Sequence, residues 1–298
     1  MPVSKKALAV LCCLYAGMAF GIYWIPVRKL RDVGYDGVWS VFVFSVIPLL
    51  LVIPLIVRRW RVLCRETPAF HICCALAGIV FALYIGAYLY TDVVHAIALY
   101  YLLPIWGFIF GRIFIGDPIT GARWLAMILA LAGLIVLFSQ KIGVPVPGRL
   151  GDWMALLAGV IWGGVALMLY IGKAAPIDYA LGFVVCNAIA SFALAFTVSA
   201  MGTAGYPEWS RLKSELIWLI PFCGFVVVPA AFSTVYGPSQ LSPGVSGLLF
   251  MTEISVTAVS AAIFSGEPFG WRECAGVALI TVAGTMEPFK MLRAKATA

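Results

Sequence analysis

AGMAFG, residues 16–21, returns as AGVIWG at residues 158–163, which is 142 positions later. Each copy places two glycines four residues apart beside an aromatic ring, a spacing that lets helices approach closely inside a membrane. A second pair of motifs follows in the same order, because Gly-Asp-Pro at residues 116–118 and Gly-Glu-Pro at residues 266–268 lie 150 positions apart. The sequence therefore predicts two related halves.

The composition excludes a soluble domain. Hydrophobic residues make up 63% of the 298 residues, charged residues make up 11%, and the mean hydropathy is +1.03. Soluble domains carry roughly 25% charged residues. The apolar segments are too long and unbroken for a membrane β-barrel, in which hydrophobicity alternates along each strand. We therefore predict an all-α polytopic membrane protein.

A membrane-spanning helix needs about 20 consecutive apolar residues, and the chain offers ten such segments. The expected spans are 7–26, 37–57, 70–90, 94–114, 124–139, 153–172, 180–200, 216–237, 244–265 and 273–289. Five spans fall in each half. Because five is odd, the second half must enter the membrane upside-down relative to the first, which makes an inverted repeat. We expect a first repeat at residues 1–142, a linker at 143–152 and a second repeat at 153–298.

The basic residues predict how the chain lies in the membrane. With the N-terminus inside, 12 of the 20 Lys and Arg residues fall in inner segments and 8 in outer loops. This bias predicts a multi-pass protein of the inner (plasma) membrane with both termini in the cytoplasm. The net charge of +7 is explained by these loops, so nucleic acid is not an expected partner. The eight cysteines show no CxxC spacing, and neither a metal site nor a disulfide is predicted.

The repeated small-x-x-aromatic-Gly helix and the Gly-acid-Pro connector together resemble EamA repeats. The arrangement is similar to that of the drug/metabolite transporter superfamily, specifically its EamA-type ten-helix exporters of amino acids and related metabolites. This resemblance implies a central cavity lined mainly by the first, third, fourth, sixth, eighth and ninth spans. The first connector has Asp117 where the family more often has Glu.

Glu253 lies near the middle of the ninth span, in the stretch LLFMTEISVTAVS. An acid at this depth costs about 2.5–3.5 kcal/mol or more to insert, so it faces the bundle interior or a water-filled path. Two interpretations stay open: a carboxylate that couples protons or binds a substrate ammonium, and a structural acid hydrogen-bonded across a helix contact. We take Glu253 as the proton-coupling and substrate-binding candidate.

Aromatic side chains supply the other candidates. In the first span Trp24 shares a helix face with Gly17 and Gly21, and Trp162 repeats this arrangement in the second half. Aromatic faces stack on planar substrates and bind cations, although packing or an interfacial belt explains each ring equally well on its own. The substrate-binding candidates are Trp24, Tyr84, Tyr88, Tyr101, Trp106, Trp162 and Glu253. Asp92 and His95, in the link between the third and fourth spans, are interpreted as an interfacial hydrogen-bonding pair or a helix cap.

These features predict a secondary transporter that exports small amphipathic metabolites, amino acids including aromatic ones, by alternating access. Proton-coupled efflux of lipophilic cations is the alternative transport function, with Glu253 shared by drug and proton. A third hypothesis from another class is an intramembrane serine protease, because residues 244–247 read GVSG. Its serine would need a histidine as base, and His71 and His95 both lie near span ends.

We therefore expect no enzyme activity, no catalytic residue and no cofactor. The expected partners are a small-molecule substrate, the lipid bilayer and protons as candidate coupling ions. The substrate, the direction of transport, its coupling and the oligomeric state stay open.

Overall fold

The computed structural model describes residues 5–35, 37–142, 147–202, 204–265 and 269–296. Within these ranges the chain is helical and contains no strand. The elements in order are α1 (Lys5–Gly21), α2 (Trp24–Asp32), α3 (Val38–Leu63), α4 (Pro68–Ala87), α5 (Val93–Tyr100), α6 (Leu103–Ile115), α7 (Gly121–Ile142), α8 (Leu150–Ile171), α9 (Pro176–Ala200), η1 (Trp209–Arg211), α10 (Leu212–Phe222), η2 (Cys223–Val227), α11 (Val228–Gln240), α12 (Pro243–Phe250), α13 (Thr252–Ser265) and α14 (Trp271–Ala296).

Nine helical segments of the described chain are long and apolar enough to cross a membrane. Their bounds are Lys5–Asp32, Val38–Leu63, Pro68–Ala87, His95–Ile115, Gly121–Phe138, Leu150–Ile171, Pro176–Ala200, Trp209–Gln240 and Pro243–Phe264. These segments fit the predicted polytopic membrane protein, with one span fewer than the ten expected.

The tenth expected span, residues 273–289, lies within α14, which packs along α7. Its apolar stretch from Cys274 to Met286 is short and is flanked by Arg272, Glu273 and Glu287. The side chains of α14 are described only as far as Met286, so this span lies only partly within the described residues and the count of ten stays a prediction.

Several spans are interrupted, which the apolar pattern alone did not predict. α1 and α2 separate at residues 22–23, α5 and α6 at residues 101–102, and α12 and α13 at Met251. A π-helix, η2, separates α10 from α11. Pro104 lies in the first turn of α6, where its missing N–H leaves no hydrogen bond unmade. These interruptions change the direction of a span inside the bundle.

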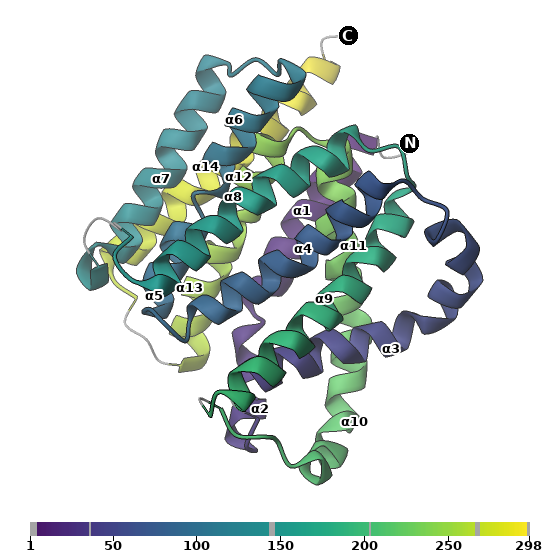
Figure 1. The fold of residues 1–298 in the computed structure, drawn as a ribbon. Helices are drawn as coiled ribbons and strands as arrows, with labels where there is room; N and C mark the ends of the chain where they lie inside the picture. The colour runs from purple at the N-terminus through teal and green to yellow at the C-terminus, as the bar shows by residue number, and fades with distance from the viewer. Residues whose placement is uncertain (1–4, 36, 143–146, 203, 266–268, 297–298) are drawn as a thin grey trace.

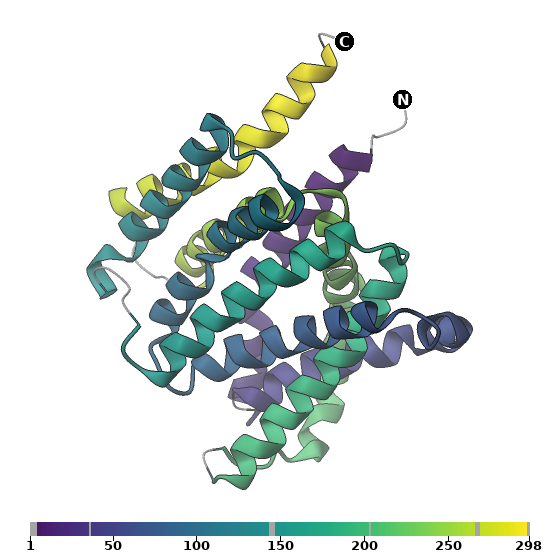
Figure 2. The same cartoon turned by 45° about the horizontal axis from the view of Figure 1, so that its top comes forward.

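The helices pack so that distant parts of the sequence lie side by side (Figures 1 and 2). α7 lies against α14 on one flank, and α3 lies against α9 on the other. Between the flanks, α4 packs on α8 and α1 packs on α11. α1 begins and α14 ends at the same end of the bundle, the upper end in Figure 1.

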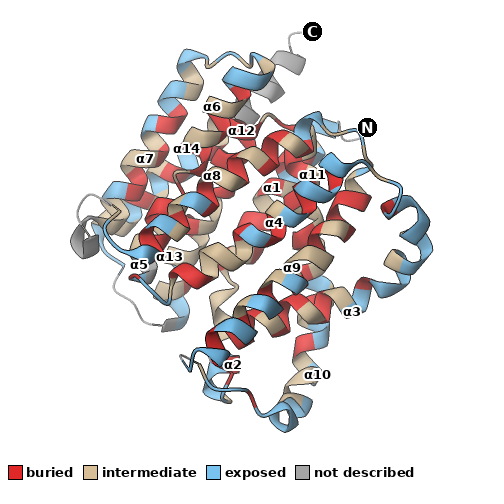
Figure 3. Cartoon of the chain, viewed as in Figure 1, coloured by how far each residue is buried: buried red, intermediate tan, exposed pale blue. Residues whose placement is uncertain are grey.

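Burial follows this arrangement, with most buried residues on the helices between the flanks (Figure 3). Large apolar side chains cover the outer surface; Ile217 is 82% exposed and Phe225 is 81% exposed. Extensive apolar surface of this kind is rare on monomeric soluble proteins. In a bilayer these side chains meet lipid.

The expected linker and the two Gly-acid-Pro connectors lie only partly within the described residues. α7 ends at Ile142, but α8 begins at Leu150, three positions before the expected start of the second repeat. In the first connector Gly116 has a φ of 66° and ends α6, and Asp117 forms an ion pair of 2.8 Å with Arg123. The second connector, residues 266–268, lies outside the described residues.

Candidate functional site

A cavity of about 350 Å³ lies inside the bundle. Its lining includes the buried side chains of Trp162, Phe183 and Phe250 and the exposed residues Gly37 and Leu89. This volume is within the usual range of small-molecule sites. The lining residues are Phe20, Tyr23, Trp24, Val27, Gly37, Val38, Val41, Val80, Phe81, Tyr84, Ile85, Tyr88, Leu89, Ile97, Tyr100, Tyr101, Leu103, Trp162, Phe183, Thr234, Phe250, Glu253 and Thr257.

Glu253 supplies the charge of this cavity. The described lining contains no Asp, Lys, Arg or His besides this glutamate. Glu253 lies in the first turn of α13, directly after the interruption at Met251. The Tyr101 side chain lies close enough to the Glu253 carboxylate to interact with it. The cavity is therefore an apolar, aromatic space with one acidic group.

Four tyrosines surround that acidic group. Tyr84 and Tyr88 come from the end of α4, and Tyr100 and Tyr101 come from the end of α5. The rings of Tyr84 and Tyr100 stack with their centroids 4.1 Å apart, while the Tyr84–Tyr88 and Tyr100–Tyr101 pairs meet edge to face at 5.2 Å. All four lie close enough to Glu253 to interact with it electrostatically. Together they form a tyrosine wall that faces the carboxylate.

Trp24 also lines the cavity and is hydrogen-bonded to α13. Its Nε1 donates to Ser260 Oγ at 3.0 Å, and Ser260 donates in turn to the Gly21 carbonyl at 3.2 Å. A Cβ on Gly21 would lie 2.9 Å from the Glu253 carbonyl oxygen, and one on Gly17 would lie 3.2 Å from the Glu253 nitrogen. The glycine face predicted from the repeat therefore packs on the helix that carries Glu253.

The matching glycine face of α8 packs on the first half of the chain. A Cβ on Gly159 would lie 2.6 Å from the Tyr100 carbonyl oxygen, and one on Gly163 would lie 2.9 Å from the Trp106 Cβ. Trp162, on the same helix, meets Phe250 edge to face with the ring centroids 6.1 Å apart. Trp106 does not line the cavity, and its Nε1 is buried without a hydrogen-bond partner among the described residues.

Six of the seven sequence candidates thus lie around one cavity, and Trp106 lies outside it. Tyr100, Thr234 and Thr257 also line the cavity, although they were not among the candidates predicted from the sequence. Two of these had a usable signal, because Tyr100 precedes Tyr101 and Thr257 lies one helical turn after Glu253. Thr234 had none, since its hydroxyl bonds to the Ala230 carbonyl of its own helix at 2.8 Å.

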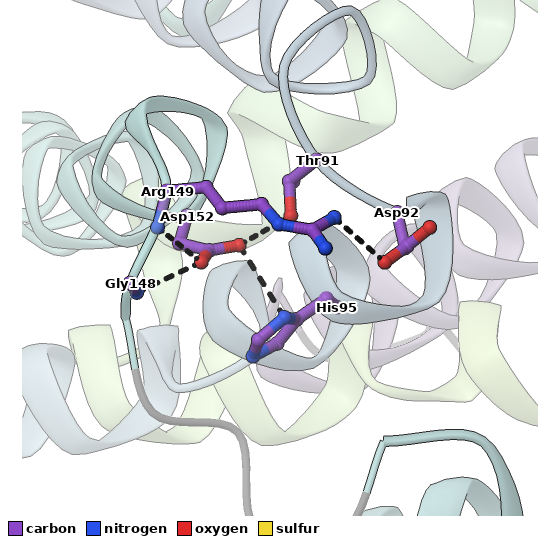
Figure 4. Close-up of polar contacts among 6 residues, drawn as sticks. All are labelled: Thr91, Asp92, His95, Gly148, Arg149 and Asp152. Atoms are coloured by element: carbon purple, nitrogen blue, oxygen red, sulfur yellow. Dashed lines mark hydrogen bonds and ion pairs between the residues drawn. The ribbon is translucent and has the colours of Figure 1, made fainter.

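Asp92 and His95 do not form the pair or the cap that their spacing suggested. Asp92 occupies the N-cap position of α5 without a side-chain capping bond and pairs instead with Arg149 at 3.1 Å. His95 Nδ1 lies 3.4 Å from Asp152 Oδ1 (Figure 4). Both residues therefore contact the start of α8, a partner that neighbouring positions in the sequence could not reveal.

The GVSG stretch is buried in the bundle. Ser246 is fully buried in α12, and its hydroxyl donates to the Pro243 carbonyl at 3.0 Å. Among the described residues, no group of three or more His, Cys, Asp or Glu side chains could hold a metal ion.

Residues 7–139 match the EamA-like transporter family. The chain is 25% identical to the chloramphenicol-sensitive protein RarD of Pseudomonas aeruginosa over 256 residues. This alignment covers 82% of this chain and 79% of RarD. Both matches support the assignment of this chain to the drug/metabolite transporter superfamily. The resemblance seen in the repeated motifs is thus confirmed.

The fold of this drug/metabolite transporter is also found in a solved crystal structure. That protein aligns with a TM-score of 0.73 at 17% identity, over 97% of this chain and 99% of its own. The family match and the apolar helices of the present chain indicate a multi-pass membrane transporter. Its aromatic cavity with Glu253 is the candidate substrate site.

Proposed function

We propose that this transporter exports small amphipathic amines, including amino acids with aromatic side chains, across the inner membrane by alternating access. Glu253 holds the substrate ammonium in this proposal, and the surrounding rings hold its apolar part. The observation that carries it is one carboxylate, without a cationic residue in the described lining, facing the tyrosine wall.

The chemistry of the lining favours a cation with an apolar body. A cation over an aromatic face gains about 0.5–2 kcal/mol, and most where water is excluded. The Glu253 carboxylate adds direct charge pairing in a region of low dielectric. Trp24, Tyr88 and Trp162 come from different helices, so together they would contact several faces of one bound molecule.

Two inverted five-span repeats, residues 1–142 and 153–298 with a linker between them, form the second part of the proposal. The helix bounds support it, because three pairs of helix ends lie 150 positions apart. α5 and α12 both have eight residues and begin 150 positions apart; α6 and α13 end 150 positions apart; α7 and α14 begin 150 positions apart.

Reciprocal contacts support the same arrangement. A Cβ on Gly133 of α7 would lie 2.8 Å from the Gly276 carbonyl of α14, and one on Gly276 would lie 2.9 Å from the Gly133 carbonyl. On the other flank, Ser45 Oγ of α3 lies 3.0 Å from Ser191 Oγ of α9. Each contact joins corresponding spans of the two halves, the fifth with the tenth and the second with the seventh, as expected where a two-fold axis relating two repeats passes between them.

Alternating access is supported by unequal packing along the fourth and ninth spans. At one end α6 packs closely on α12, and a Cβ on Gly107 would lie 2.7 Å from the Pro243 carbonyl oxygen. At the other end α5 and α13 both turn residues into the cavity, for example Ile97 and Thr257. A bundle closed at one end and open at the other is one of the two states that such a carrier needs.

Proton-coupled efflux of lipophilic cations is the second candidate function. The specific observation in its favour is that the described lining offers no Lys or Arg to bind the carboxylate of an amino acid. The relative RarD is described as chloramphenicol-sensitive, which connects this group of transporters with a drug phenotype. Glu253 would then serve both the cation and the coupled proton.

The two candidates are separated by flux measurements in proteoliposomes with L-phenylalanine and phenethylamine, which share one ring and one amine. The proposal predicts saturable uptake of both compounds, reduced by Glu253→Gln. Uptake of phenethylamine alone would favour cation efflux and overturn the amino-acid assignment. If the protein moves neither compound, the proposed substrate class is wrong.

The orientation is tested separately. Both termini are proposed to face the cytoplasm, and reporter fusions after Lys290 and within residues 140–152 should report opposite sides of the membrane. A periplasmic signal from the fusion after Lys290 would reject either the ten-span arrangement or its orientation.

A further inference from the structure

Asp152 is a buried acid at the start of α8, with 1% of its surface exposed. Its Oδ2 accepts hydrogen bonds from the backbone nitrogens of Gly148 at 2.9 Å and Arg149 at 2.8 Å. Its Oδ1 accepts from the Thr91 hydroxyl at 2.5 Å and lies 3.4 Å from His95 Nδ1 (Figure 4). One carboxylate therefore contacts the start of α8, the α4–α5 link and the first turn of α5.

Below this network, α5 is seated on α8 without space between the backbones. A Cβ on Gly151 would lie 2.8 Å from the Thr91 nitrogen, and one on Gly159 would lie 2.6 Å from the Tyr100 carbonyl oxygen. Between these glycines, Ala155 is fully buried in a cluster with Ala96 and Leu99. The first and last turns of α5 are thus both fixed to the same helix.

α5 also carries part of the cavity wall. Ile97 and Tyr100 line the cavity, and so does Tyr101, which directly follows the helix and lies close to Glu253. Any movement that changes the opening of the cavity must displace this wall relative to α13. The contacts that hold α5 therefore determine which neighbouring helix this part of the cavity wall moves with.

The corresponding half-helix in the second half has no such carboxylate. Ser242 takes the N-cap position of α12, 150 positions after Asp92 at the N-cap of α5. Its hydroxyl is buried and has no hydrogen-bond partner in the described part of the chain. The polar attachment is therefore a property of α5 and not of the repeat in general.

We propose that Asp152 is a positioning residue for transport: it fastens α5 to α8, so that the tyrosine wall moves with α8 as one body. This inference rests on the proposed alternating access. The carboxylate is suited to the task because an ionised acceptor binds several donors at once, and such bonds are roughly twice as strong as neutral ones.

Asp152→Asn tests the fastening, because an amide keeps the shape of the side chain but has only one acceptor oxygen. Hydrogen–deuterium exchange of the full chain in nanodiscs should show α5 amides exchanging about tenfold faster, while α12 amides stay unchanged. Asp92→Asn is the matched control, since it removes an exposed ion pair of the same network and should leave α5 within about twofold.

The same variants are then compared in transport of phenethylamine and L-phenylalanine. Asp152→Asn should lower the maximal rate about tenfold while KM stays within about twofold, because the cavity residues remain in place. Thr91→Val is the second variant if Asp152→Asn does not fold, and it should shift both readouts in the same direction.

Unchanged exchange in α5 would overturn the fastening, and an unchanged maximal rate would overturn the positioning role. If substrate affinity and maximal rate fall equally in Asp152→Asn, Asp152 stabilises the fold and has no positioning role in transport. If the wild-type protein moves neither amine, the proposed function fails and the positioning role falls with it. The exchange data are independent of the substrate, so the two failures are distinguishable.

Discussion

α5 (Val93–Tyr100) and α12 (Pro243–Phe250) have the same length and lie 150 positions apart, yet their surroundings differ. Every residue of α12 is buried, and the helix packs against α6 and α1. α5 turns Ile97 and Tyr100 into the cavity, and its N-cap residue Asp92 is exposed. In α12 the cavity-lining residue is Phe250, at its last position, so this unit is largely closed in the second half and open in the first.

The environment of each half-helix thus depends on the helix that packs against it, and not on its length or its position in the repeat. α12 is closed because α6 crosses it where Gly107 and Gly247 leave no side chain between the backbones. If the two halves exchange roles during transport, α5 takes a closed environment in the other state and α12 opens.

The largest effect is expected at the closed crossing. In Gly107→Ala the new Cβ would lie 2.7 Å from the Pro243 carbonyl oxygen, and backbone atoms cannot move aside cheaply. We expect a loss of about 1–3 kcal/mol in stability and little remaining transport, measured by thermal unfolding in detergent and by flux.

Gly111→Ala is the matched control one turn further along α6. Its Cβ would meet its nearest neighbour, Asp117 Cβ, at 3.7 Å, an ordinary contact distance. Stability should stay the same or rise slightly, because alanine favours a helix over glycine by roughly 0.5–1 kcal/mol. Equal behaviour of the two variants would mean that the crossing is not tight.

An intermediate effect is expected from the tryptophans of the open cavity. Trp162→Ala should weaken phenethylamine binding about tenfold, within the range of cation–π contacts in dry sites. Trp106→Ala removes a ring from α6 that does not line the cavity, so affinity per folded molecule should change less than about twofold. Equal losses of affinity would place the substrate elsewhere.

The smallest effect is expected on the flank away from the open and closed ends. Trp39 Nε1 donates to Ser199 Oγ at 2.8 Å, and Ser45 lies in hydrogen-bond contact with Ser191 on the same pair of helices. Trp39→Phe or Ser45→Ala should each cost about 0.6 kcal/mol, the average found for side-chain hydrogen bonds between membrane helices. Thermal unfolding checks the cost, and a change in substrate preference would contradict the passive role of this flank.

Much of the fold was predictable because apolar runs and small residues act locally. The runs located nine described spans, and the glycine spacing in α1 and α8 indicated close helix contacts. The interruptions of α5–α6 and α12–α13 were not predicted, since Tyr101 and Met251 are ordinary apolar residues in a helix. Their backbone follows from packing across the cavity, which periodicity does not report.

The candidate site was predictable at residue types that are rare in membrane-spanning helices. An acid in mid-span is costly, so Glu253 was selectable from the sequence, and rings near it on lining helices followed. Trp106 lies outside the cavity, on α6 beyond the break at residues 101–102, a break that the apolar pattern does not report. Asp152 was not selected because it lies at the end of a polar linker, and its partners Thr91 and His95 are about 60 positions away.

Glu253→Gln is the most direct test of the central claim, that this carboxylate carries the transport chemistry of the cavity. The variant keeps the shape and hydrogen-bonding capacity of the side chain but removes its charge and its titration. Gradient-driven accumulation and substrate exchange of phenethylamine are measured in the same vesicles over a range of external pH.

If this carboxylate carries the transport chemistry, Glu253→Gln loses gradient-driven accumulation of phenethylamine together with its pH dependence. Exchange then separates the two roles of the group: exchange falls together with affinity if Glu253 binds the ammonium, and it persists if Glu253 only couples protons. Wild-type accumulation with unchanged pH dependence would contradict the account and leave Glu253 as a structural acid.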